Sequence, residues 1–170
     1  MKAVILGVDP GLQVTGYAIL KYDSPQTNVI DFGYLKLNSV NEKEISIRIH
    51  NFYSFFTEKI QHHKVTHIAI ETPFLGKNAQ TFLKLGYLRG ILYLLSQLHS
   101  CQLYEFSPRE VKSAVTGFGA ASKEQVAFMM FRMFKGLETV KVTARADVTD
   151  ALAVSLCGLL SISSMNKLQR

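Results

Sequence analysis

The sequence predicts an α/β protein built on a mixed five-stranded sheet that is flanked by helices on both faces. Three apolar segments come first, and the connections between them are too short to hold helices, which indicates an antiparallel meander. After position 41, helical segments alternate with two more apolar strands, the pattern of parallel strands joined by crossovers. Because the chain has 170 residues, 48% of them apolar, we expect residues 1–170 to form a single domain.

The first three strands are predicted from β-rich runs that end at turn residues. Residues 3–9 (AVILGVD) are too short for a helix and are followed by a Pro-Gly pair. Residues 14–20 and 28–37 are rich in β-branched and aromatic side chains, and residues 22–25 (YDSP) separate them as a turn.

Helical spacing appears in residues 41–63, where apolar side chains recur every three or four positions. A strand, a helix, a strand and three helices then follow, and we expect them at residues 67–71, 78–99, 102–106, 108–115, 122–134 and 146–160. Ser107 and Ser122 are predicted as helix N-caps, with Pro108 in a first turn and Gly117 in a loop.

Composition also bears on location. The longest charge-free run after Asp150, residues 151–166, is shorter than the roughly 20 residues that span a bilayer. The N-terminal segment reaches a charge at Asp9 and lacks the features of a secretory signal. We therefore expect a cytoplasmic protein without a membrane contact, in which Cys101 and Cys157 are buried thiols.

The net charge of +6 is concentrated in one part of the chain. Residues 72–146 hold ten basic and four acidic side chains, whereas the remainder holds nine of each. A polyanionic partner such as nucleic acid explains this distribution. A basic, solvated surface without a partner explains it equally well from charge alone.

Four acidic residues stand where a core-building sequence would not place charge. Asp9 and Glu71 each follow a buried strand, and if these strands are parallel neighbours both carboxylates emerge at one edge of the sheet. Asp147 and Asp150 lie three positions apart at the start of an apolar helix, and so share a face. We therefore expect the four carboxylates to form one acidic site.

Grouped carboxylates repel one another, and burial raises their pKa unless cations keep them ionised. Oxygen ligands alone favour Mg²⁺ or Mn²⁺, and a pair of such ions is a device that hydrolyses phosphodiesters. Taken singly, each acid also has a structural explanation: Asp147 as a helix cap, Asp150 as an exposed first-turn acid, and Asp9 and Glu71 as turn formers. For the four acids to have no common function, four independent structural explanations would all have to hold.

Five segments of the chain also carry a specific family resemblance. They read VILGVDPGLQVTGYAIL, IAIETPF, KNAQTFLKLGYLRG, SPREVKSAVTGFGAASKEQV and ADVTDALAV. In this order and at this spacing they resemble the RuvC family of Holliday junction resolvases, over residues 2 to about 160. The resemblance implies an RNase H-like fold, a homodimer, and Mg²⁺- or Mn²⁺-dependent paired nicks in four-way junction DNA. It also implies a partnership with the RuvA–RuvB branch-migration complex.

By the same resemblance, the catalytic and metal-binding carboxylates of the family fall on Asp9, Glu71, Asp147 and Asp150. The junction-facing aromatic residue falls on Phe74, and the DNA-contacting lysines fall on Lys112 and Lys123.

Lys77 is a further phosphate-contact candidate, because it follows Phe74 closely. Without the resemblance, Phe74 would be read as a core residue, and Lys112 and Lys123 as surface lysines. His62, His63 and His67 are expected at a polar helix end rather than at a metal.

One apolar stripe in the predicted helix at 78–99 is either core or a dimer surface. It consists of Phe82, Leu85, Leu88, Leu92 and Leu95.

Three other functions compete with junction cutting. A related RNase H-like nuclease could process structured RNA. The run from Asp9 also resembles the phosphate hairpin of actin-like ATPases, but 170 residues leave no room for their second domain. A DNA-binding module with a dead site would have lost one of the four acids, and all four are present.

Overall fold

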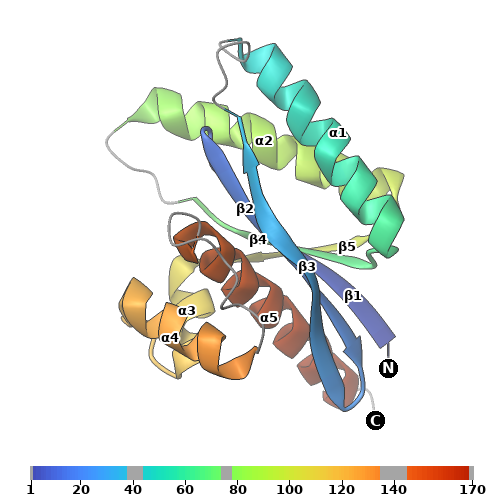
Figure 1. Ribbon diagram of the computed structural model, residues 1–170, viewed down its shortest axis with the longest axis vertical. Coiled ribbons are helices and arrows are strands. Elements are labelled where there is room, and N and C mark those ends of the chain that lie inside the picture. The colour runs from blue at the N-terminus through green and yellow to red at the C-terminus, as the bar shows by residue number, and fades with distance from the viewer. Residues whose placement is uncertain (1, 38–43, 74–77, 135–144, 169–170) are drawn as a thin grey trace.

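The computed structural model describes residues 2–37, 44–73, 78–134 and 145–168 (Figure 1). Its five strands form one sheet in the order β3-β2-β1-β4-β5. They are β1 (Lys2–Asp9), β2 (Val14–Asp23), β3 (Gln26–Lys36), β4 (His67–Glu71) and β5 (Gln102–Phe106). The first three pair antiparallel, and β4 runs parallel to both β1 and β5, which confirms the predicted meander followed by parallel strands.

Helices cover both faces of this sheet, as the sequence predicts (Figure 1). They are α1 (Ile45–His63), α2 (Ala79–Leu98), α3 (Pro108–Thr116), α4 (Lys123–Met133) and α5 (Arg145–Leu168). The first two lie over one face, and α5, with α3 and α4 against it, lies over the other. Ser107 and Ser122 cap α3 and α4 through reciprocal capping boxes, as predicted.

Two predicted boundaries are wrong. β2 continues through residues 22 and 23, which were expected in the turn, because both pair with β1 on one side and with β3 on the other. α5 continues to Leu168 instead of ending near residue 160, since neither proline nor glycine follows to stop it. The predicted start of α1 at residues 41–43 lies outside the described residues.

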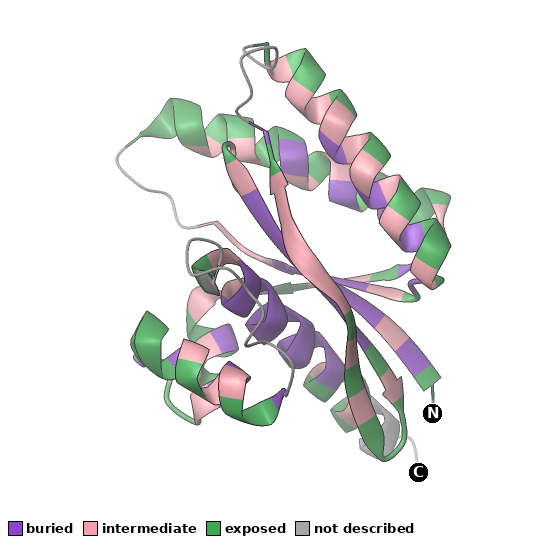
Figure 2. Cartoon of the chain, in the orientation of Figure 1, coloured by how far each residue is buried: buried purple, intermediate pink, exposed green. Residues whose placement is uncertain are grey.

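α5 is the central helix of the larger core, and it is buried along most of its length (Figure 2). Residues 146–164 are long and apolar enough to span a membrane by length and composition, although the sequence argument excluded such a segment. Of the most apolar window, 67% is buried inside the fold, as in the core helix of a soluble protein. Cys101 and Cys157 are buried free thiols, as expected.

Three glycines let α5 lie directly on the sheet. A Cβ atom at Gly7 would overlap Ser155, and one at Gly16 would overlap the backbone carbonyl of Asp147. At Gly158, on the helix itself, a Cβ atom would touch Ala69 of β4 at 3.0 Å. These contacts fix the position of α5 relative to β1, β2 and β4.

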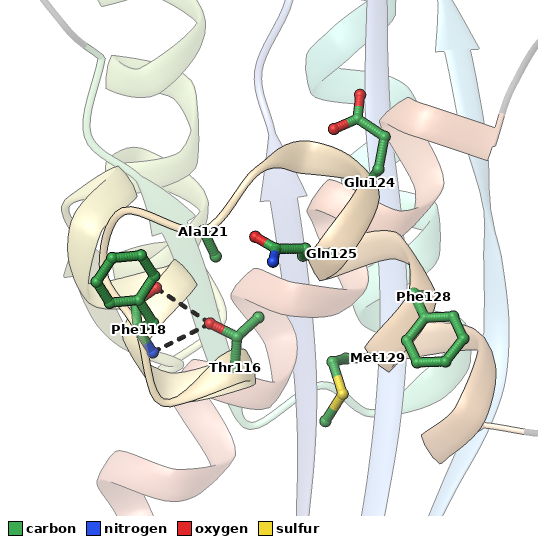
Figure 3. Close-up of a pocket in the computed structure, with 7 residues that line it drawn as sticks. All are labelled: Thr116, Phe118, Ala121, Glu124, Gln125, Phe128 and Met129. Atoms are coloured by element: carbon green, nitrogen blue, oxygen red, sulfur yellow. Dashed lines mark hydrogen bonds between the residues drawn. The ribbon is translucent and has the colours of Figure 1, made fainter.

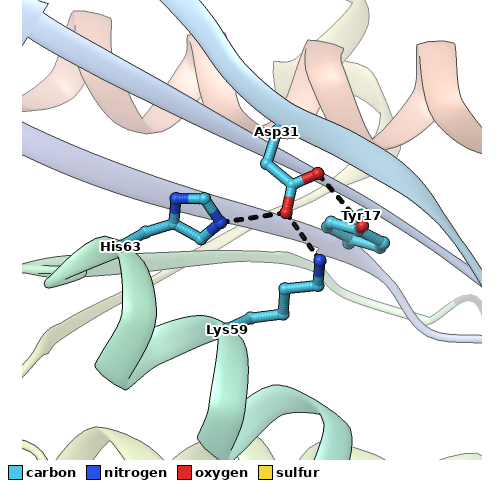
Figure 4. A network of polar contacts seen from close by, with 4 residues as sticks. All are labelled: Tyr17, Asp31, Lys59 and His63. Carbon is cyan, nitrogen blue, oxygen red and sulfur yellow. Dashed lines mark hydrogen bonds and ion pairs between the residues drawn. The ribbon is translucent and has the colours of Figure 1, made fainter.

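A polar network fastens α1 to the sheet (Figure 4). Asp31 of β3 accepts hydrogen bonds from Lys59 Nζ at 2.6 Å and Tyr17 Oη at 3.2 Å, and its Oδ2 lies 3.0 Å from His63 Nε2. Burial alone would raise the pKa of Asp31, but the hydrogen bonds and charges of Lys59 and His63 outweigh it and lower that pKa. His62 and His63 thus lie in the last turn of α1, as expected, and His63 contacts Asp31.

Candidate functional site

Asp9 and Glu71 lie at the same edge and on the same face of the sheet. Val8 and Ile70 are register partners in the parallel strands β1 and β4, and both pack into the core beneath α1 and α2. Because successive side chains of a strand point to opposite faces, the next residue of each strand projects toward α5. Asp9 and Glu71 therefore emerge together, as the sequence predicts.

The start of α5 brings the other two acids to this edge. Gly16 of β2 is the register partner of Asp9, and the backbone of Asp147 lies directly against Gly16. Asp150, one turn further along α5, lines a pocket of about 220 Å³ together with Glu71. Three elements distant in sequence thus contribute four half-buried carboxylates to one place.

The electrostatics show how closely these acids interact. Burial, followed by the charges of Asp150 and Glu71, raises the pKa of Asp9 to about 7. Burial and the charge of Asp150 also raise the pKa of Glu71 and that of Asp147. The site therefore carries more negative charge than its protein surroundings neutralise, and positive charge is what it would bind.

Two lysines predicted to contact DNA lie at this site. Lys123, at the start of α4, donates a hydrogen bond from Nζ to Asp150 Oδ2 at 3.0 Å, while its side chain remains 74% exposed. Lys112 of α3 lines the same pocket. The hydrogen bond and charge of Asp150 raise the pKa of Lys123, so this ammonium stays charged. The other two predicted DNA contacts, Phe74 and Lys77, lie outside the described residues.

The donor set fits a hard divalent cation. All four acids offer carboxylate oxygens, which Mg²⁺ and Mn²⁺ prefer, and the raised pKa of Asp9 reports negative charge that such an ion would offset. Within the described ranges, no three acidic, histidine or cysteine side chains are grouped tightly enough to hold an ion without rearrangement. The hydrogen bond from Lys123 also occupies Asp150 Oδ2, so a bound ion would compete with this ammonium for that oxygen.

We expect the metal-free protein to lose stability as the pH rises from about 4 to about 7. The pKa of Asp9 lies above its ordinary value of 3.8, so the folded state binds this proton more tightly than the unfolded state does. The stabilisation is present below the unfolded pKa and is lost as the pH rises through the folded pKa. Urea unfolding in EDTA at several pH values should give a shallower decline for Asp9→Asn than for the wild type. Equal declines would show that Asp9 is not electrostatically strained.

Sequence reasoning missed two features of the site. The ion pair between Lys123 and Asp150 joins residues 27 positions apart, and no local pattern marks it. The close approach of α5 at Gly16 did leave a signal, because a glycine inside a strand of β-branched and aromatic residues marks a place where another backbone comes close.

Comparisons with known proteins agree with this geometry. The family model "Crossover junction endodeoxyribonuclease RuvC" matches residues 5–158. A relative of that name from Chlorobium phaeobacteroides is 47% identical over 161 residues, covering 95% of this chain and 83% of the relative. Another from Legionella pneumophila is 33% identical over 165 residues, covering 97% and 91%.

Among solved structures, RuvC of T. thermophilus in complex with a Holliday junction substrate superimposes with a TM-score of 0.80. The two chains are 22% identical, and the match covers 91% of this chain and 92% of that one. This likeness confirms the RNase H-like α/β fold. Because the family model matches residues 5–158 and the two relatives are 47% and 33% identical over most of the chain, the chain belongs to the RuvC family of crossover junction endodeoxyribonucleases.

Proposed function

We propose that this chain is a structure-selective endonuclease that resolves four-way (Holliday) DNA junctions by paired symmetric nicks, in homologous recombination and DNA repair. The observation that carries the proposal is the convergence of Asp9, Glu71, Asp147 and Asp150 on one face at the carboxyl edge of the sheet, in a member of the RuvC family. A relative of known structure was captured with a Holliday junction substrate. Residues 1–170 act together as one nuclease domain.

The four carboxylates hold two Mg²⁺ ions, and Mn²⁺ can serve in their place. Bound ions of this kind activate a water molecule and stabilise the leaving oxygen in phosphodiester hydrolysis. Asp9 and Glu71 present their carboxylates from the rigid sheet, and α5 presents Asp147 and Asp150 from its first turns. This separation onto three packed elements fixes the direction from which each carboxylate reaches the ions.

Basic and aromatic side chains around the acids position the DNA. Lys112 and Lys123 line the pocket of Glu71 and Asp150. From there they contact phosphates close to the one that is cut. Lys77 makes a further phosphate contact, and Phe74 stacks on a base opened at the junction centre.

We expect Lys112→Ala to weaken junction binding for every sequence and to lower its dependence on salt. A phosphate contact carries no base information, and losing one reduces the slope of log affinity against log salt by roughly one unit. Affinity titrations at several salt concentrations measure this slope. Lys21→Ala, at an exposed position of β2, is the matched control and should leave the slope unchanged. An unchanged slope for Lys112→Ala would show that Lys112 is a solvated surface lysine that does not contact the DNA.

The direct test of the proposed function is a comparison of substrates. The purified protein is given a labelled four-way junction, a matched linear duplex and a structured RNA, each with Mg²⁺ or with a chelator. We expect cutting of the junction alone, by symmetric nicks in the presence of the metal. Preferential cutting of the RNA would favour the competing RNA-processing activity, and cutting that persists in the chelator would contradict the metal mechanism.

Helix α2 supports the homodimer that the family resemblance implies. Within the predicted stripe, Leu88, Leu92 and Leu95 are buried in the core. A second apolar stripe faces outward and consists of Leu83, Tyr87, Leu94 and Leu98, which are 59%, 42%, 47% and 57% exposed. Open space surrounds the Cβ positions of Gly86 and Gly90 on the same helix, so another backbone could approach closely. We propose that a second copy of the chain covers this face, which gives two active sites for the two nicks.

We expect Leu94→Glu to convert the dimer into a monomer, because it buries an unpaired carboxylate in the proposed interface. Sedimentation velocity of the wild type and the variant at equal concentration measures the change. Ile47→Glu, a similarly exposed apolar position on α1, is the matched control and should remain dimeric. If the Leu94→Glu protein sediments like the wild type, the interface lies elsewhere.

Two further parts of the proposal follow from the family. The chain works with the RuvA–RuvB branch-migration complex, and it does so in the cytoplasm, where bacterial DNA is found. The burial of α5 in the core supports a protein without a membrane contact.

A further inference from the structure

A second pocket, of about 420 Å³, lies between α3 and α4 (Figure 3). Its lining is mostly apolar and consists of Thr116, Phe118, Ala121, Glu124, Gln125, Phe128 and Met129. Phe118 and Phe128 stand on opposite sides of it in Figure 3, and they are 62% and 59% exposed. Two large aromatic side chains exposed at one pocket form an apolar patch, and such a patch is typical of a binding site.

The loop that carries Phe118 is firmly anchored. Thr116 Oγ1 accepts a hydrogen bond from the Phe118 amide at 3.1 Å and lies 2.8 Å from the carbonyl oxygen of Lys112. The amide of Ala121 donates to the Phe118 carbonyl at 3.1 Å, and Gly119 packs against the side chain of Arg109. The backbone is therefore fixed while the ring of Phe118 faces solvent, a pre-organised surface for a flat ligand.

This pocket adjoins the acidic site. Lys112 lines the acidic pocket, and Thr116, one turn further along α3, lines the second. At the start of α4, Lys123 likewise lines the acidic pocket, and its neighbour Glu124 lines the second. A DNA strand held by the two lysines would pass directly beside the aromatic pair.

The polar groups of the pocket suit a nucleobase. Gln125 Oε1 accepts a hydrogen bond from the Ser122 amide at 2.8 Å, which directs the amide NH₂ group of Gln125 toward the space between the two rings (Figure 3). That group can donate to a base carbonyl. The guanidinium of Arg132 lies 5.6 Å from the centre of the Phe128 ring, so positive charge accompanies the aromatic surface.

We propose that this pocket binds an unpaired base of the junction strand, stacked on Phe118 or Phe128 with a carbonyl accepting from Gln125, and so contributes to the sequence at which the chain cuts. The inference rests on the proposed function and adds a base contact beyond Phe74. An apolar protein segment is the competing occupant. Lys112, Lys123 and Arg132 around the pocket outnumber its one carboxylate, Glu124, and this charge favours DNA, as does the continuity with the acidic site.

Three variants test the pocket. Phe118→Ala and Phe128→Ala remove one stacking surface each, and neither ring is buried enough for its loss to unfold the protein. Gln125→Glu retains the capping box, since glutamate serves there as well, but replaces the donor with an acceptor. Ile47→Ala, at an exposed apolar site on α1, is the control. Each protein is assayed for affinity to a four-way junction in EDTA, and for its cutting profile on junctions with randomised bases at the crossover in Mg²⁺.

We expect at least one phenylalanine variant to bind the junction at least about fivefold more weakly, as loss of a base stack requires. The same variant should lose base preference at one position, and Gln125→Glu should change the preferred base at that position, whereas Ile47→Ala should match the wild type. Unchanged affinity and preference in all three pocket variants would overturn the inference, and would leave a protein segment as the occupant to be sought. A wild type that neither binds nor cuts junctions would instead refute the proposed function itself.

Discussion

Asp9→Asn should lower the rate of junction cutting by at least about 100-fold, because a metal ion supplies several kcal/mol of charge stabilisation to the transition state and each 1.36 kcal/mol is a factor of ten in rate. Asparagine keeps the shape of the side chain but removes the charge that holds the ion. Asp9 lies among three other carboxylates, whose charges together with burial oppose its ionisation, and a bound ion would offset that cost. Junction affinity should remain near the wild-type value, because lysines rather than carboxylates contact the phosphates.

Single-turnover cutting of a labelled junction in Mg²⁺, with affinity measured on the same preparation, provides this test. Asp23→Asn is the matched control, since Asp23 is an exposed acid that pairs with Lys2 on the surface at 3.3 Å. It should cut at the wild-type rate. If the Asp9→Asn protein cuts as fast as the control, Asp9 does not bind the catalytic metal.

Among the variants proposed here, Gly16→Ala should destabilise the fold most, and it should also impair cutting. A Cβ atom at this position overlaps the backbone carbonyl of Asp147, and a backbone atom cannot move aside as a flexible side chain can. Overpacking of a core costs about 1–3 kcal/mol, and we expect Gly16→Ala at or above the upper end of that range. The start of α5 would be displaced together with Asp147, and a shift of about 1 Å in a positioned group can cost roughly 100-fold in rate.

Urea unfolding and junction cutting of the Gly16→Ala protein measure the two effects. Gly33→Ala is the matched control, because Gly33 lies in the neighbouring strand and the atoms nearest to a Cβ atom there belong to the side chain of Tyr17, at 3.2 Å. This variant should be less destabilised and should cut normally. If Gly16→Ala were as stable and as active as Gly33→Ala, the packing of α5 would not determine where Asp147 lies.

Local patterns predicted most of the fold because each element carries its own signal. Apolar runs that end at glycine or proline marked β1 and β4, and serine caps marked the starts of α3 and α4. The predictions failed where the boundary depends on partners rather than on local sequence. The last residues of β2 are strand because β1 and β3 pair with them, and no pattern in residues 21–23 reveals those partners.

For the candidate site too, the features with a local sequence signal could be predicted, and those that depend on packing partners could not. Asp9 and Glu71 could be placed at one sheet edge on the condition that their strands are parallel neighbours, and the shared face of Asp147 and Asp150 follows from helical spacing. The sequence could not indicate that Lys123 bonds to Asp150, since that contact depends on how α4 packs against α5. It also could not indicate which apolar stripe of α2 faces outward, because both stripes have helical periodicity.

The central claim is that four carboxylates form one site for divalent metal, and Mn²⁺ binding tests it without reference to cutting. Electron paramagnetic resonance titration of free Mn²⁺ should give about two bound ions per wild-type chain, as a paired-ion site requires. Asp9→Asn, Glu71→Gln, Asp147→Asn and Asp150→Asn should each bind fewer ions or bind them more weakly, whereas Asp23→Asn should match the wild type. Identical binding curves for all six proteins would contradict the account.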